Sequence, residues 1–109
     1  MVQSRRIHGD YELHYDADPG WCFYCDDPAD GIDHALPQSA VISNPGLQTT
    51  HRHMMFQVPV CDECNAAAGT TVDYSMAERA ARIAVVLSKR KRTPVMELRL
   101  AHLAKRAQS

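Results

Sequence analysis

The stretches that decide the fold are Trp21-Cys22-Phe23-Tyr24-Cys25 and Cys61-Asp62-Glu63-Cys64. Two residues between paired cysteines allow both thiolates to turn toward one point, and two such pairs complete the tetrahedral sulfur shell of structural zinc. The 35 residues between the pairs exceed the usual zinc-ribbon spacing, so we expect a sizeable insertion inside the metal-closed loop. The sequence therefore predicts that Cys22, Cys25, Cys61 and Cys64 bind a zinc ion that contributes to the free energy of folding.

Three other interpretations of the cysteines stay open. The first pair is similar to the redox dithiol of thioredoxin-like proteins, but only twenty residues precede it and the second pair would go unexplained. An iron–sulfur cluster also takes four cysteines. Four unconnected buried cysteines are the weakest alternative, because the spacing repeats.

Length and composition limit the classes of protein to which this chain can belong. A chain of 109 residues, with 45% hydrophobic and 23% charged residues, has ordinary globular usage and room for one small domain, 1–109. It contains no apolar run near the roughly 20 residues that span a bilayer. The N-terminus has no apolar segment typical of a secretory signal. We therefore expect a cytoplasmic protein with no membrane partner, in which cysteines bind metal rather than form disulfides.

Charge is divided unevenly along the chain, although the net charge is −1. Residues 1–75 carry eleven acidic and three basic side chains, whereas residues 76–109 carry nine basic and two acidic ones. Such segregation suits a cationic arm that meets phosphate. A solvated helix face that complements the helix dipole would give the same pattern. The run Lys89, Arg90, Lys91 and Arg92 is our candidate for contact with a nucleic-acid backbone.

The middle of the chain reads as two strands and a loop. We expect a short strand over residues 32–36 that stops near Pro37, and a second over residues 54–60 that leads into Cys61. Residues 38–50 read as a loop, with Asn44-Pro45-Gly46 at its centre. Residues 21–25, with aromatics between the cysteines, fit the tip of a hairpin.

The last third, residues 75–109, reads as two helices. Ser75 with Glu78 fits a capping box, and the first helix should end around residues 89–92. Thr93 and Pro94 then open a second helix as N-cap and first-turn proline. Apolar residues recur at helical spacing in both segments and predict packing against the core or a dimer seam. These residues are Met76, Ala80, Ile83, Ala84 and Leu87, followed by Met96, Leu100, Leu103 and Ala107.

Between the cysteine pairs the chain reads Gly31-Ile32-Asp33-His34-Ala35-Leu36-Pro37, and Asn65 follows the last cysteine. The order CFYC, DHALP, VPVCDECN resembles the HNH-type (ββα-metal) nucleases with a four-cysteine zinc site, most closely small bacterial and phage members. The resemblance covers residues 21–69. It implies an α+β fold, a treble-clef-like hairpin followed by a helix, with the C-terminal helices as an extension. It also implies a bacterial or phage-infected host cell.

The resemblance assigns roles to three residues. His34 matches the general base that activates water, and Asp33 and Asn65 match the side chains that hold a catalytic Mg or Mn ion. Chemistry agrees with these roles, since histidine titrates near neutrality and a hard cation prefers oxygen ligands. Adjacent strand residues point to opposite faces, so a regular strand cannot aim Asp33 and His34 at one phosphate. Either Pro37 or a local twist re-aims one of them, or the cation and the water lie at different edges. The expected function is metal-dependent hydrolysis of DNA.

One position departs from the family's pattern. Where the family has an asparagine before the second strand, this chain reads His51-Arg52-His53. His51 and His53 are candidates to support the site, and Arg52 is a candidate to contact phosphate.

The alternative function is a non-catalytic zinc-finger module that binds nucleic acid or a protein. A homodimer or larger assembly through the C-terminal helices is a further expectation. We expect His8, His14 and His102 at the surface, and Trp21, Phe23 and Tyr24 over the zinc.

Overall fold

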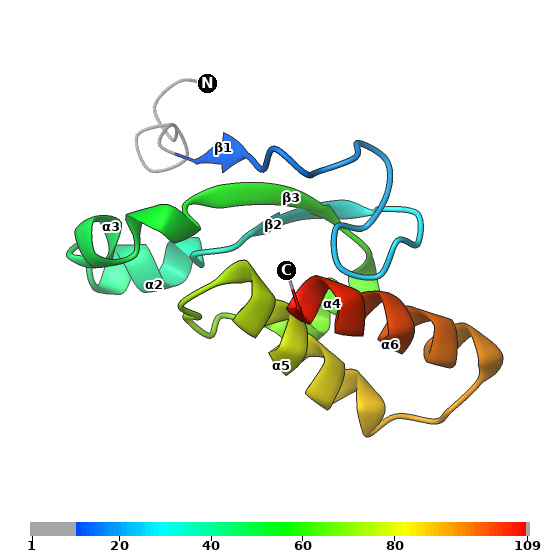
Figure 1. The fold of residues 1–109 in the computed structure, drawn as a ribbon. Coiled ribbons are helices and arrows are strands. Elements are labelled where there is room, and N and C mark those ends of the chain that lie inside the picture. The colour runs from blue at the N-terminus through cyan, green and yellow to red at the C-terminus, as the bar shows by residue number, and fades with distance from the viewer. Residues whose placement is uncertain (1–10, 109) are drawn as a thin grey trace.

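The computed structural model describes residues 11–108, and a three-stranded sheet lies at its centre. The strand order is β1-β3-β2, in which β1 (Glu12–Leu13) is parallel to β3 (Phe56–Val60) and β2 (Gly31–His34) is antiparallel to it. Helices α4 (Asp62–Ala68), α5 (Met76–Ser88) and α6 (Pro94–Ala107) form a second layer (Figure 1). The order β2-β3-α4 gives the predicted strand–strand–helix unit, and the α+β fold class is confirmed.

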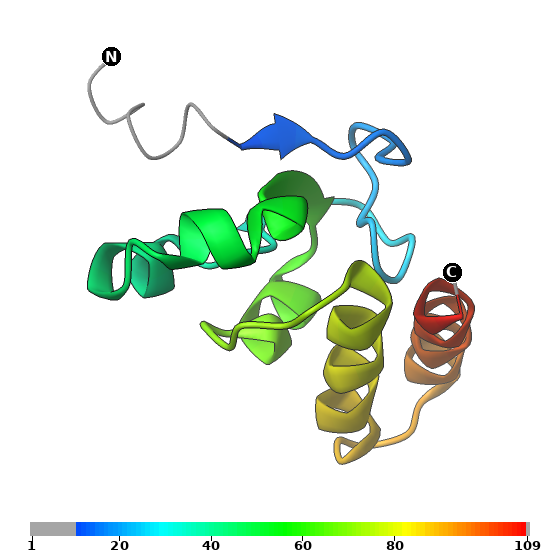
Figure 2. The ribbon, with the colours of Figure 1, turned by 60° about the vertical axis from the view of Figure 1, so that its left-hand side comes forward.

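The caps of α5 and α6 are those that the sequence predicts. The Ser75 hydroxyl accepts a hydrogen bond from the Glu78 backbone N–H at 3.0 Å, and the Thr93 hydroxyl accepts one from the Met96 N–H at 3.1 Å. Pro94 occupies the first turn of α6, where its missing N–H leaves no bond unmade. The two helices then lie side by side and pack on one another (Figure 2).

The prediction of a loop over residues 38–50 is wrong. These residues form α2 (Gln38–Ser43) and α3 (Leu47–Thr50), and a 3₁₀ turn, η1 (Arg52–Met54), follows them. Neither α2 nor α3 has a side-chain cap, which is why the sequence offers no start signal. Burial of Val41 against a small apolar cluster stabilises α2 instead. That cluster contains Tyr11, Ala35, Leu36, Val41, Met54 and Met55.

The main core lies between the sheet and the second layer of helices. It includes the four cysteines, Phe23 and Tyr24 from the turn before β2, and Val58 and Val60 from β3. The predicted apolar stripes supply the helical side: Ala80, Ile83, Leu87, Met96 and Leu103 are buried, and Met76, Ala84, Leu100 and Ala107 are partly buried against them. The C-terminal helices therefore share one core with the cysteines.

Two histidines expected at the surface, His14 and His102, are less exposed than predicted. His14 is buried, with 6% of its surface exposed, because its ring packs between Phe23 and Phe56 at centroid distances of 4.8 and 4.6 Å. His102 is half-buried and His8 lies outside the described residues. In residues 11–108, each helix is too short or too polar to cross a membrane.

Candidate metal centre and nucleic-acid interface

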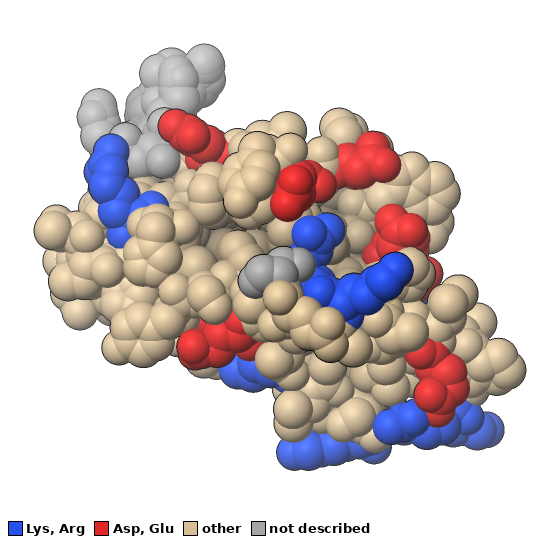
Figure 3. Space-filling model, in the orientation of Figure 1, with Lys and Arg blue, Asp and Glu red and all other residues tan. Residues whose placement is uncertain are grey.

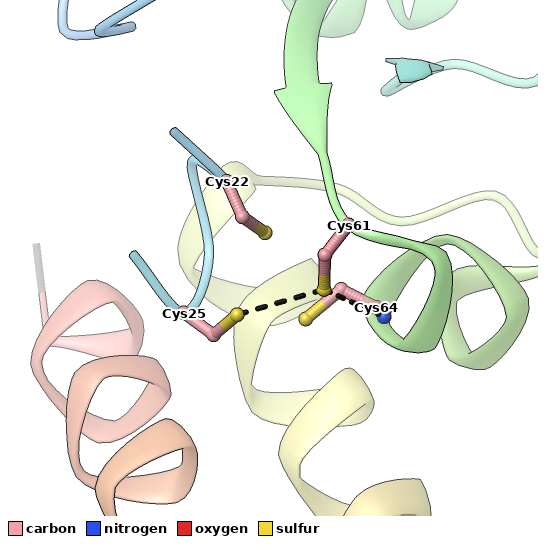
Figure 4. Close-up of side chains that lie close together, drawn as sticks. All are labelled: Cys22, Cys25, Cys61 and Cys64. Atoms are coloured by element: carbon pink, nitrogen blue, oxygen red, sulfur yellow. Dashed lines mark hydrogen bonds between the residues drawn. The ribbon is translucent and has the colours of Figure 1, made fainter. Parts of the chain in front are cut away.

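The four cysteines come from three segments that the fold brings together. Cys22 and Cys25 lie in the turn before β2, where the Asp26 N–H donates to the Cys22 carbonyl at 2.9 Å. Cys61 directly follows β3 and is the N-cap of α4, and Cys64 lies in the first turn of that helix (Figure 4). Trp21 pairs with Pro28 across the turn, which confirms the hairpin tip predicted for residues 21–25.

The sulfur atoms have the spacing that a tetrahedral metal ion requires. All four lie within 4.8 Å of one another, and the Cys25 and Cys61 sulfurs are 3.6 Å apart. A tetrahedron with zinc–sulfur bonds of about 2.3 Å would separate its sulfurs by about 3.8 Å. The Cys61 sulfur also accepts a hydrogen bond from the Cys64 N–H at 3.4 Å, which orients it toward the centre. This group, the four-cysteine cluster, can hold a structural metal ion such as zinc.

Burial separates the four-cysteine cluster from solvent. The four cysteines are at most 4% exposed, and Phe23 and Tyr24 are buried beside them, whereas Trp21 stays 46% exposed. The Arg106 guanidinium lies over the Phe23 ring, 3.7 Å from its centroid. Buried sulfurs out of reach of a partner suit a structural role better than thiol exchange.

Asp33 lies on the face of β2 that packs against the helices, and a cationic side chain already neutralises its carboxylate. Arg79 of α5 donates from Nη2 to Oδ1 at 3.0 Å and from Nε to Oδ2 at 3.1 Å. The Tyr24 hydroxyl donates to Oδ2 at 2.7 Å. Arg79 is fully buried and Asp33 is 4% exposed. Arg79 therefore makes the charge contacts that a cation bound to Asp33 would make.

The ion pair continues into a chain of four charges. Arg79 also donates from Nη1 to Asp73 at 2.7 Å, and Arg82 donates to the same carboxylate at 2.8 and 2.9 Å. Burial alone would raise the pKa of Asp73, but the hydrogen bonds from Arg82 and Arg79 lower it below its ordinary value. Burial and the negative charge of Asp33 hold the pKa of Tyr24 well above its usual range. The network ties the cysteine turn, β2 and α5 together.

His34 lies on the opposite face of β2 from Asp33, as strand alternation requires. Its ring meets the Tyr11 ring edge-on, with centroids 4.7 Å apart, and the Tyr11 hydroxyl donates to the Leu36 carbonyl. Burial raises the pKa of Tyr11 to about 12, so this hydroxyl stays protonated. The sheet thus holds Asp33 and His34 in two different environments.

The remaining candidate residues lie in separate parts of the molecule. Asn65 is exposed on α4, the helix that packs against β2. His51 is buried and stacks on Tyr74 with centroids 5.0 Å apart, and the His53 ring nitrogen bonds the Tyr74 carbonyl at 2.7 Å. These histidines hold the segment before α5, rather than contacting Asp33. Arg52 is exposed.

The basic run forms an exposed turn between α5 and α6. Arg90 pairs with Glu63 and Arg92 with Glu97, whereas Lys89 and Lys91 have no acidic partner within ion-pair distance among residues 11–108. Basic side chains gather along the lower edge of the molecule in Figure 3, at the α5–α6 end, and acidic ones gather mainly at the upper right. We call residues 89–92 the basic turn.

The sequence gives no indication of the partners of Asp33. Arg79 looks like one of the two basic residues on α5, and Tyr24 like a cover for the metal. The only local signal is that Arg79 falls one position before Ala80 in the apolar stripe, on the buried side of the helix. In the described range 11–108, the four-cysteine cluster is the one group of three or more His, Cys, Asp or Glu placed to hold a metal.

Comparison with family models, with curated proteins and with solved structures finds no match to this chain. The functional argument therefore depends on the contacts and charges described above.

Proposed function

We propose that this chain is a zinc-stabilised module that binds nucleic acid through the basic turn and does not cut it. The observation that carries the proposal is the buried pair of Asp33 with Arg79. A catalytic cation at Asp33 would have to displace a guanidinium that makes two hydrogen bonds there and leave that charge buried. Strand alternation also separates Asp33 from His34.

The basic turn supports the binding half of the proposal. Its four cations are exposed at one end of the molecule, and two of them, Lys89 and Lys91, have no acidic partner within ion-pair distance among residues 11–108. Lysine and arginine side chains in such a position contact phosphate without reading sequence, so binding should weaken as salt rises. The four-cysteine cluster anchors α4, and the core it belongs to holds α5 and α6, which flank the turn.

Fluorescence anisotropy with labelled DNA at several salt concentrations tests this function. Lys91→Gln should weaken binding and lower the slope of log affinity against log salt by about 0.7–0.9, the loss of one phosphate contact. Arg52 is the phosphate contact expected at the nuclease-like site and lies at an exposed position outside the turn, so under this proposal Arg52→Gln should leave the slope unchanged. Equal effects of the two substitutions, or no binding at low salt, would overturn the proposal.

A second candidate function is metal-dependent hydrolysis of DNA. It is favoured by the packing of α4, which carries Asn65, against the strand that ends in Asp33 and His34. Plasmid nicking with magnesium, manganese or EDTA separates the two candidates. Under the binding proposal no cation produces nicks. Cation-dependent nicking that disappears in His34→Ala would instead establish hydrolysis, with Arg79 releasing Asp33 to the cation.

A further inference from the structure

A pocket of about 450 Å³ opens between the sheet and the C-terminal helices. This volume falls within the range of about 300–1,000 Å³ that is typical of small-ligand sites. Its walls come from the segment after β1, the start of β3, the first turn of α5 and the last turn of α6. Figure 3 shows the molecule hollowed on this face, between the strands and the helices. The pocket shares Phe23 with the cysteine turn, but its lining includes none of the four cysteines and no member of the Asp33 network.

One wall of the pocket is a stack of aromatic rings. Tyr15 stacks on His14 with centroids 4.3 Å apart and an interplanar angle of 23°. Phe56 supports both rings edge-on, at 6.5 Å from Tyr15 and 4.6 Å from His14. Burial lowers the pKa of His14, so the stack is uncharged at neutral pH. Tyr15 is the outermost ring, 82% exposed, and it offers a flat face to a planar ligand.

Arg106 adds a cation to the lining of the pocket. Arg106 is fixed by its hydrogen bond from Nε to the Phe23 carbonyl at 3.0 Å and by the Phe23 ring beneath it. The nearest acidic group is Asp16, whose carboxylate lies 4.0 Å from Nη1 and is largely exposed. Such a distant, solvated pair leaves much of the positive charge available to an anion. The pocket therefore combines a flat aromatic surface with one positioned guanidinium.

We propose that this pocket receives a base of single-stranded nucleic acid, with the base stacked on Tyr15 and a backbone phosphate beside Arg106. The inference deepens the proposed function and rests on it. Aromatic platforms next to cations are how proteins hold single strands, whereas a duplex keeps the faces of its bases covered. The basic turn contacts phosphates only, so it does not by itself predict that bases are stacked on the protein.

Helix α6 connects the pocket with the basic turn. Arg92 directly precedes its N-cap and Arg106 lies in its last turn, so the two basic positions mark opposite ends of the helix. Its 14 residues, at about 1.5 Å each, span about 21 Å. An extended strand lying along α6 would place phosphates at the turn and a base in the pocket. The surface along α6, from Arg92 to Arg106, would then form one continuous binding site for a single strand.

Nuclear magnetic resonance of the ¹⁵N-labelled, zinc-loaded protein tests the pocket directly. Adenosine monophosphate should shift the amide signals of Tyr15, Phe56 and Ala77, and ribose 5-phosphate, which lacks a base, should shift them much less. Equal shifts from both ligands would indicate an adventitious phosphate only and would overturn the assignment. So would an absence of shifts in these residues at millimolar ligand.

Anisotropy with an oligothymidylate of about 12 nucleotides, within the range of about 4–16 covered by single-strand-binding folds, tests the strand. Tyr15→Ala should weaken its binding by about 5- to 150-fold, the loss of one stacked base. Tyr74→Ala is the matched control, because Tyr74 is also exposed but does not line the pocket. Equal effects of the two substitutions would contradict the proposal.

The outcomes distinguish the pocket from the basic turn. If Lys91→Gln weakens oligonucleotide binding and Tyr15→Ala does not, the proposed function stands and the pocket proposal fails. If duplex DNA binds and the oligonucleotide does not, the pocket proposal fails alone, and if neither binds at low salt, both proposals fail. A duplex that competes as well as the single strand overturns the base-stacking proposal alone.

Discussion

Arg79 joins α5 to β2 and to the loop after α4 through one charged side chain. Its side chain is fully buried and bonds Asp33, Asp73 and the Thr71 carbonyl. Burial opposes the charge on Arg79, but the hydrogen bond and negative charge of Asp33 raise its pKa above the ordinary value, so it stays charged. Asp33, which the resemblance assigns to a catalytic metal ion, is therefore held in a structural ion pair with Arg79.

We predict that Arg79→Met lowers the free energy of unfolding by about 3–5 kcal/mol, because it leaves the buried Asp33 carboxylate without a cation and leaves Asp73 paired with Arg82 alone. Arg90→Met is the matched control. It breaks only the exposed pair with Glu63, which should cost less than about 1 kcal/mol after screening by solvent. Urea denaturation of both zinc-loaded variants gives the comparison. Similar midpoints for the two variants would show that the buried network contributes little.

At the scale of elements, helices that begin at a capping residue can be predicted from the sequence, and helices without one cannot. The caps of α5 and α6 are confirmed by the bonds to Ser75 and Thr93. Helices α2 and α3 have no side-chain cap and form because their apolar residues are covered by the second cluster. Helices of six and four residues depend on such tertiary packing, since short isolated helices are marginal in water.

The N-cap of α5 is therefore expected to contribute measurably to stability. Ser75→Ala should lower the free energy of unfolding by about 1 kcal/mol, because the Glu78 N–H loses its acceptor. Ser88→Ala is the matched control at the other end of α5, where the exposed hydroxyl donates only to the Val85 carbonyl. Thermal or urea unfolding followed by circular dichroism measures both. A larger loss from Ser88→Ala would contradict the assignment of Ser75 as the cap.

At the scale of the whole molecule, the cysteines bring together segments that lie far apart in the sequence. They connect the turn before β2, the end of β3 and the start of α4, and they belong to the same core as α5 and α6. A metal ion bound to all four would therefore stabilise both layers. A small domain with a limited core is expected to depend on such a bond.

We predict one zinc ion per chain, and we expect that its removal disrupts the tertiary structure. Elemental analysis of the purified protein measures the stoichiometry, and near-ultraviolet circular dichroism follows the aromatic residues packed beside the cysteines. A chelator should abolish that signal, and added zinc should restore it, because metal binding and folding are coupled. The same chelator saturated with zinc is the control. A signal that survives in metal-free protein would contradict a structural role for the metal.

Features that depend on residues close together in the chain can be predicted from the sequence. The cysteine spacing, the capping residues and the apolar stripes each express a local geometry, and all reappear in the structure. The hairpin strands also lie close to where the sequence predicts them. The cysteine spacing was enough to predict the four-cysteine cluster, whereas the α+β class was predicted with the help of the resemblance described in the sequence analysis.

The environment of the candidate site, in contrast, depends on contacts between distant parts of the chain. Asp33 meets Arg79, a residue 46 positions away, and His14 is buried by rings from two other segments. Charge and burial at a given residue depend on which distant groups the fold brings against it, and a single sequence does not specify that pairing. The same reason explains α2 and α3, whose stability comes from a cluster assembled from four separate stretches of chain.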